Sequence, residues 1–202
     1  MAATPSRSQA DCIDVDKTRM GKTMNMKKIG YTSILFLGIL ASSLLHAGTQ
    51  QFDQSMGPVV EAYLKIQEAL ADDKTDGVKL SAEKVAALSD NLDPGTVSGE
   101  HAAHYKDLPV KIKTAALKLA KGKKIGSMRK AFKDLSRPIA MWATMSKPER
   151  IYVLYCPMAK ASWLQTDENI RNPYYGHKML RCGKIVGGQP QDDGPQHQLK
   201  GH

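Results

Sequence analysis

Two cysteines near the carboxyl end of the chain each have a methionine close by. Cys156 and Met158 stand two residues apart in Cys-Pro-Met, and Met179 and Cys182 stand three apart, a spacing that places side chains on one face of a helical turn. If the two ends of this segment meet, they form a site of two thiolates and two thioethers. Such soft ligands select Cu(I) over Mg²⁺, Ca²⁺ or Mn²⁺. The residue types and spacings therefore predict a soft-metal site.

The residues between the two ends bear on the same prediction. His177 is a further candidate ligand, because imidazole binds copper and zinc. Asn172-Pro173 is typical of a turn, which would fold the chain back so that Cys182 approaches Cys156. The alternative is a disulfide between these two cysteines, the usual fate of a cysteine pair in an exported domain. The residues alone leave both interpretations open.

An export signal is indicated near the amino end. Residues 24–47 have a basic start, an apolar run from Ile34 to Leu45 and then the small residue Ala47. The run is short for a bilayer span, and this order is typical of a secretory signal peptide. We therefore expect cleavage near Ala47, a periplasmic location and a mature domain that is not embedded in the membrane.

The residues before this signal are polar and show no periodicity. An extension over residues 1–23 would be unusual ahead of a signal peptide, so we expect translation to start at Met24 or Met26. Cys12 lies in this extension, which leaves Cys156 and Cys182 as the cysteines of the mature protein.

The elements that must position the cysteines are mainly helical. Apolar residues recur at three- and four-residue spacing over residues 52–72, 76–92, 99–121 and 125–145, which predicts four amphipathic helices. Each apolar stripe needs a partner, and short links favour antiparallel neighbours. The sequence therefore predicts a mainly α fold, an up-and-down antiparallel four-helix bundle.

The pattern of residue types changes after the fourth predicted helix. Residues 151–155 (IYVLY) and 163–165 read as short strands, and residues 172–188 are rich in turn formers. We expect a small, irregular, short-strand cap that completes a domain over residues 48–188. Residues 189–202 are polar, and we expect a disordered tail there.

The overall charge and the motif content exclude some classes of function. The chain has a net charge of +9, but its lysines are spread along the helices among acidic residues rather than clustered with aromatic ones, so we expect no nucleic-acid partner. We find no nucleophile–base arrangement, phosphate loop or Cys-x-x-Cys motif. We therefore expect a protein that is not an enzyme.

The chain resembles a known family over most of residues 52–186. The stretches FDQSMGPVVEAYLKIQEALADD, IGSMRKAFKDLS and YCPMAKASWLQTDENIRNPYYGHKMLRCG are similar to an uncharacterised bacterial family of exported helical domains, domain of unknown function 3347. Its members occur alone or fused to periplasmic adaptor subunits of copper and silver efflux pumps. The resemblance points to Cys156, Met158, Met179 and Cys182 as the motif sulfurs. Its framework would consist of Trp163, Asn172, Pro173, Tyr174, Tyr175 and Gly176.

These observations lead to one expectation and one alternative. We expect a periplasmic heavy-metal-binding accessory, for Cu(I) in particular, that meets an efflux adaptor or a metal donor protein. This chain lacks the adaptor segments of the fused members. The alternative is a non-catalytic protein-interaction domain in which a Cys156–Cys182 disulfide is structural and Trp163, Tyr174 and Tyr175 form a docking surface.

Overall fold

A computed structural model describes the backbone of residues 30–188 and the side chains of residues 49–188. The chain divides into two units, residues 1–39 and 40–202. The predicted extension (1–23) and tail (189–202) lie outside the described residues, as do the side chains of the predicted signal peptide (24–47). In the part of the chain that is described, no helix combines the length and apolar character needed to cross a membrane.

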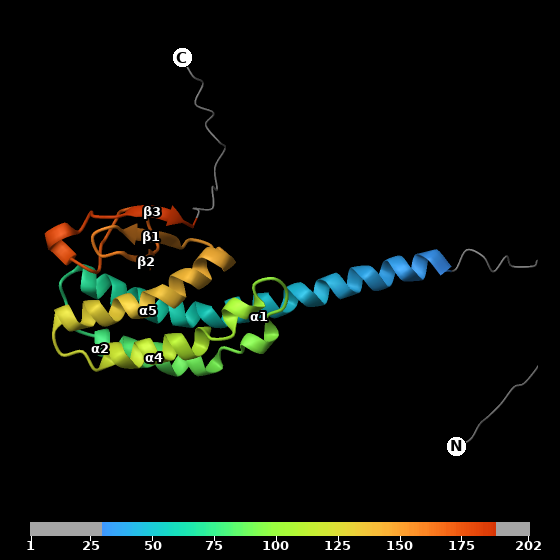
Figure 1. Cartoon of the computed structure of the whole chain (residues 1–202), viewed down its shortest axis with the longest axis horizontal. Coiled ribbons are helices and arrows are strands. Elements are labelled where there is room, and N and C mark those ends of the chain that lie inside the picture. Colours follow the sequence, from blue (N-terminus) through green and yellow to red (C-terminus); the bar gives the residue numbers. More distant parts are fainter. Residues whose placement is uncertain (1–29, 189–202) are drawn as a thin grey trace, which may run out of the picture. The chain divides into compact units, whose positions relative to one another are not determined.

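Helices make up most of the described chain. They are α1 (Gly30–Ala71), α2 (Val78–Leu88), α3 (Ala102–Tyr105), α4 (Leu108–Ala120) and α5 (Ile125–Ser146) (Figure 1). Three short 3₁₀ turns accompany them, η1 (Ser89–Asn91), η2 (Pro94–Thr96) and η3 (Gly176–Met179). The predicted stretch 99–121 is divided in two, because Pro109 lacks an N–H and lies in the first turn of α4.

Three short strands form an antiparallel sheet. They are β1 (Tyr152–Cys156), β2 (Ala161–Gln165) and β3 (Lys184–Gly187), in the order β2-β1-β3. The sequence predicted the first two strands but not β3, which falls in the segment expected to be turns. The mainly helical fold with a short-strand cap is confirmed. The up-and-down bundle topology stays a prediction.

The core joins the helices to the sheet. α4 packs between α2 and α5, and α5 also lies against β2 and β1. The Tyr63 ring stacks on Phe132, with ring centroids 5.0 Å apart, and its hydroxyl group hydrogen-bonds Ser136 at 2.7 Å. The same hydroxyl accepts the Leu164 N–H at 3.2 Å. One buried side chain of α1 therefore connects α5 and β2.

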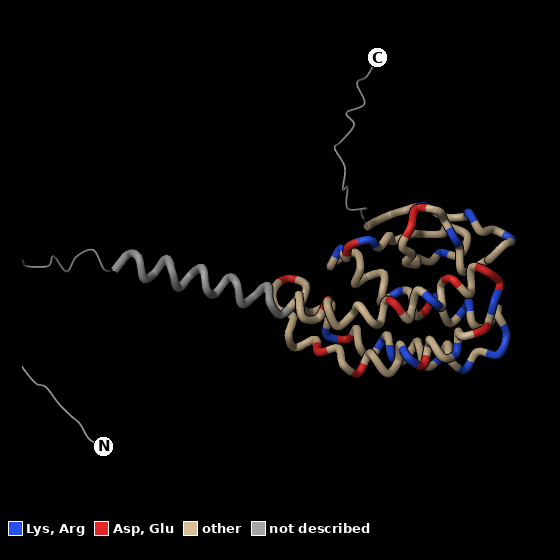
Figure 2. The backbone as a smooth tube through the Cα atoms, turned by 180° about the vertical axis from the view of Figure 1, so that it is seen from behind, with Lys and Arg blue, Asp and Glu red and all other residues tan. Residues whose placement is uncertain are grey.

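Charged residues are distributed over the helices. Figure 2 shows Lys/Arg and Asp/Glu interspersed along the tube of the helical region. The ion pairs that join neighbouring helices are exposed, such as Lys113 with Asp90 and Lys118 with Asp134, both at 2.6 Å. Exposed pairs contribute about 0.2–1 kcal/mol each, so the apolar core provides most of the stability.

Candidate functional site

Cys156 and Cys182 come together at one end of the sheet. Their Sγ atoms are 3.5 Å apart, and both are free thiols. Cys156 is the last residue of β1, and the chain that follows Cys182 enters β3, which pairs with β1 through Tyr155 and Lys184. The contact between the cysteines therefore follows from the antiparallel pairing of the first and third strands.

A tight turn surrounds the Cys156 sulfur. This turn links β1 to β2, and the Ala159 N–H points back to the Cys156 Sγ at 3.4 Å. The turn is closed by the Lys160 N–H donating to the Pro157 carbonyl at 3.3 Å. Lys133 of α5 donates to the Ala159 carbonyl at 2.7 Å and ties the turn to the helices. Cys156 is fully buried by these contacts.

Asn172 holds the segment that carries Cys182. Its buried side chain accepts the Tyr174 N–H at 2.8 Å, which forms the predicted Asx turn, and it donates to the Cys182 carbonyl at 2.6 Å. The Asn172 N–H donates to the Leu180 carbonyl at 2.8 Å. Cys182 itself donates its N–H to the Met179 carbonyl at 3.0 Å. The segment is thus closed on itself by one amide side chain.

The two thiols differ in acidity. Burial raises the pKa of Cys156, but donors at its sulfur together lower this pKa below the ordinary value: the Ala159 N–H, the Cys182 thiol, the Asn172 amide and the Met158 N–H. The hydrogen bond to Cys156 raises the pKa of Cys182, and burial and the negative charge of Cys156 raise it further. The first proton therefore leaves Cys156, and Cys182 then donates to the thiolate.

The other three predicted ligands lie on the same segments, in different surroundings. Met158 is 62% exposed in the turn after Cys156, so its side chain lies largely in solvent. Met179 is half-buried at the end of η3. His177 is exposed, and its Nδ1 pairs with Asp73 Oδ2 at 2.8 Å. The structure therefore brings the two thiols together, while the imidazole is engaged with a carboxylate.

Asp73 and Arg129 form a clasp that sequence analysis missed. Arg129 donates to Asp73 at 2.5 Å, to the Leu70 carbonyl at 2.7 Å and to the Pro173 carbonyl at 2.9 Å. Asp73 also accepts the His177 N–H at 3.0 Å. The Arg129 hydrogen bond is the largest cause that lowers the pKa of Asp73, followed by the bonds from His177. These bonds fasten the segment before Cys182 to α1 and α5.

Gly176 is the sequence signal that could have revealed this clasp. It has a φ of +58°, which favours glycine, and a Cβ there would collide with the Asp73 and Arg129 side chains. The sequence shows the glycine but not its distant neighbours. Only the fold shows that the backbone at Gly176 lies against the Asp73 and Arg129 side chains.

Two of the three residues of the predicted docking surface, Trp163 and Tyr174, are buried, and the third, Tyr175, is half-buried. Trp163 is fully buried and Tyr174 is 9% exposed, so neither aromatic ring is available to a partner. Their rings pack edge to face, with centroids 6.0 Å apart, and Tyr174 also contacts Phe132 of α5. Both are packing residues. They support the segment that carries Cys182, residues 172–183 (the cysteine segment), because Gly183 lies against the Trp163 ring.

Histidine and carboxylate clusters do not provide another metal site in the described part of the chain. His101 and His104 are exposed, with ring centroids 6.2 Å apart. No group of three or more His, Cys, Asp or Glu residues within that part could hold a metal ion. A metal at the cysteine pair would therefore depend on thiolates and thioethers.

The order of thiol ionisation can be measured. In a Cys12→Ser background, Cys182→Ala removes a hydrogen-bond donor, so we expect the pKa of Cys156 to rise. Cys156→Ala removes the group that raises the pKa of Cys182, so that pKa should fall toward its ordinary value. Thiolate absorbance followed against pH under reducing conditions reports both. A pKa of Cys156 that falls in the first variant would contradict the assignment of donor and acceptor.

Comparison with known proteins identifies the helical part of the chain. Residues 59–150 match the family model described as "Protein of unknown function (DUF3347)". No curated protein and no solved structure matches the chain. The matched segment includes α2 to α5 and ends before β1, so the cysteine pair lies outside it. Over residues 59–150, which make up less than half of the chain, the sequence therefore matches the DUF3347 family of proteins of unknown function.

Proposed function

We propose that the protein is an exported heavy-metal-binding accessory whose cargo is Cu(I), held by Cys156 and Cys182. The observation that carries this proposal is the pair of free thiols with sulfurs 3.5 Å apart. Hydrogen bonds at Cys156 favour its thiolate, the form that binds metal. Metal tolerance or metal delivery in the periplasm is the role that fits such a site.

The spacing of the two sulfurs suits a shared metal ion. With metal–thiolate bonds of about 2.3 Å, two sulfurs 3.5 Å apart subtend an angle of about 100° at the metal. That bent arrangement leaves room for a third soft ligand. Met158 and Met179 are the thioethers on the two adjoining segments, and the exposed Met158 side chain is free to fold toward the pair.

The unequal burial of the two thiols suggests how the metal would pass to another protein. Cys156 is fully buried, whereas Cys182 is partly accessible. An incoming thiolate would therefore displace Cys182 first, and the metal would leave by ligand substitution. The partner would be a metal donor protein or an efflux adaptor, in keeping with the family resemblance. We also propose that the four predicted helices are arranged as an up-and-down antiparallel bundle.

A structural disulfide is the second candidate, and the same distance favours it. Sulfurs 3.5 Å apart need only a small side-chain rotation to reach the bond length of about 2.05 Å. The protein would then be a non-catalytic interaction domain with a permanent disulfide between β1 and the segment before β3. Its docking surface would exclude Trp163, which is buried.

Free-thiol counting and Cu(I) competition titration separate the two functions. We expect the Cys12→Ser protein, taken directly from cells, to show two reactive thiols after unfolding and to bind Cu(I) stoichiometrically under anaerobic conditions. The absence of free thiols, together with weak Cu(I) binding after reduction, would establish the disulfide instead.

Methionine substitutions test the thioether ligands. Met158→Leu and Met179→Leu are each expected to weaken Cu(I) binding by about tenfold, the lower end of the cost of losing a supporting partner at a metal site. Met158→Leu should leave stability unchanged because the side chain is exposed. Met145→Leu, on α5, is the matched control. Normal Cu(I) affinity in both variants would remove the methionines from the ligand set.

A further inference from the structure

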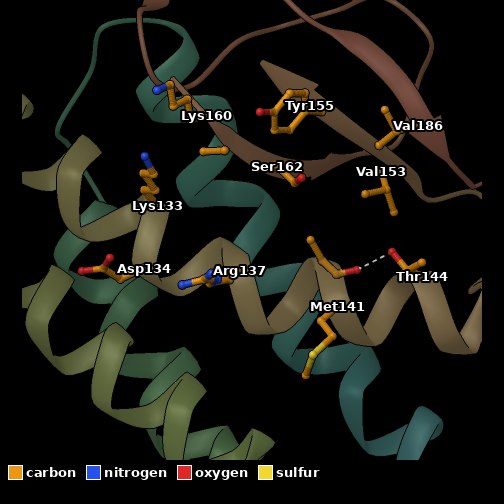
Figure 3. A pocket seen from close by; sticks show the side chains of 12 residues that line it. Lys133, Asp134, Arg137, Met141, Thr144, Val153, Tyr155, Lys160, Ser162 and Val186 are labelled. Atoms are coloured by element: carbon orange, nitrogen blue, oxygen red, sulfur yellow. Dashed lines mark hydrogen bonds between the residues drawn. The ribbon is translucent and has the colours of Figure 1, made fainter. Parts of the chain in front are cut away.

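A pocket of about 630 Å³ lies between α5 and the sheet. Its walls come from one face of α5 and from all three strands (Figure 3). The helix packs closely on β2 and touches β1, and the sheet continues to β3 beyond it. A single helix does not fill the space under three strands, and the pocket is the part left uncovered.

One end of the pocket is cationic. Lys133, Arg137 and Lys160 line it together with one carboxylate, Asp134, and Figure 3 shows the ends of the two lysine side chains near each other. Lys133 is already bonded to the Ala159 carbonyl. Among the residues that the structure describes, Arg137 and Lys160 have no carboxylate partner, because the adjacent Asp134 pairs with Lys118. Two cations are therefore available to a ligand.

The other end of the pocket is apolar. Val153 of β1 and Val186 of β3 lie there, with Met141 of α5 opposite them (Figure 3). The pairing of β1 with β3 is irregular at this place: Ile185 pairs with Leu154 and Gly187 with Val153, so Val186 is an extra residue, as in a β-bulge. Val186 is 52% exposed, so its side chain is accessible to a ligand.

We propose that this pocket binds a small single-chain amphiphile with an anionic headgroup, such as a fatty carboxylate. The headgroup would lie between Arg137 and Lys160, near the Tyr155 and Ser162 hydroxyls, and the chain would lie on Met141 and Val186. A volume of about 630 Å³ falls within the usual range of small-molecule sites. The match of charge at one end and apolar surface at the other carries the proposal.

A peptide fits this pocket less well. Every peptide unit brings an N–H and a C=O that need partners when buried. The apolar end offers the side chains of Val153, Val186 and Met141, which provide neither strong donors nor strong acceptors. The Thr144 hydroxyl also lies at this end, but it already donates to the Ala140 carbonyl. An alkyl chain has no such requirement.

Calorimetric titration of the full chain with dodecanoate, below the concentration at which it forms micelles, tests the proposal. We expect saturable binding at one site. Lys160→Gln and Arg137→Gln should each weaken it by about tenfold or more, as expected for loss of a hydrogen bond to a charged group. Lys130→Gln, an exposed lysine of α5 that does not line the pocket, should leave binding unchanged.

The apolar end has its own matched pair of variants. Val186→Asp should abolish binding, whereas Leu80→Asp should not, because Leu80 is exposed on α2 and does not line the pocket. Shortening dodecanoate should weaken binding by about fourfold per methylene removed. Equal binding of dodecyltrimethylammonium would overturn the proposal, as would loss of binding in Leu80→Asp with Val186→Asp unaffected.

Discussion

Trp163→Ala is expected to lower the free energy of unfolding by about 3–5 kcal/mol, the usual cost of truncating a buried tryptophan. Trp163 is fully buried in the middle of β2 and packs against Tyr174 and Gly183. Its Nε1 donates to Gln165 at 3.1 Å, and that bond is also lost. The measurement is denaturant unfolding of reduced protein followed by circular dichroism, with the slope of the transition compared between variants.

Two further variants make this prediction specific. Trp163→Phe keeps an aromatic ring over Gly183 and should cost less than Trp163→Ala. Leu80→Ala, at a position 72% exposed on α2, should change the free energy of unfolding by less than about 0.5 kcal/mol. If Trp163→Ala were as mild as Leu80→Ala, the cysteine segment would not depend on this packing, and a surface role for the tryptophan would have to be reconsidered.

The helices could be predicted from the sequence because their signals are local. Every periodic stretch from 52 to 145 contains an observed helix, although the stretch 99–121 is divided into α3 and α4. β3 could not be predicted in the same way. Its residues are mostly exposed, its four positions do not alternate between apolar and polar, and its pairing with β1 involves residues some thirty positions away. Strand pairing over such separations leaves little trace in composition.

The candidate site was predictable in its residue types but not in its supports. The cysteines were identified by chemistry, and Asn172-Pro173 correctly indicated a turn. The Asp73–Arg129 clasp joins residues 56 positions apart, and nothing in the two stretches that contain them indicates that they meet. His177 illustrates the consequence: as a residue type it suits a metal, but its Asp73 partner becomes visible only when α1 and the cysteine segment are placed together.

The clasp and Asn172 together explain how a short cap can hold two thiols in a defined geometry. Asn172 closes the segment on itself, and Arg129 attaches its start to two helices through the Pro173 carbonyl. On the other side, Lys133 anchors the turn that carries Cys156. Both thiols are thus positioned by the helical domain, so a metal site here would be largely formed before the metal arrives.

Cys156→Ser and Cys182→Ser are each expected to weaken Cu(I) binding by at least 100-fold, because loss of even a supporting partner of a metal ligand costs about 10–100-fold. The wild-type affinity should itself fall as the pH drops, first below the raised pKa of Cys182 and more steeply below the lowered pKa of Cys156, since protons then compete with the metal for both thiolates. Anaerobic competition titration against a Cu(I) chelator, at several pH values and in a Cys12→Ser background, measures both effects.

The two variants are informative in different ways. Cys156 is fully buried, so its substitution is also expected to cost stability, and the unfolding transition must be recorded beside the affinity. Cys182 is only partly buried, and a loss of Cu(I) binding in Cys182→Ser without a change in the unfolding midpoint would identify it as a ligand. Both variants could instead lose stability equally and keep their Cu(I) affinity in the folded fraction. That result would favour the structural disulfide, because a disulfide affects the stability of the fold and not metal binding.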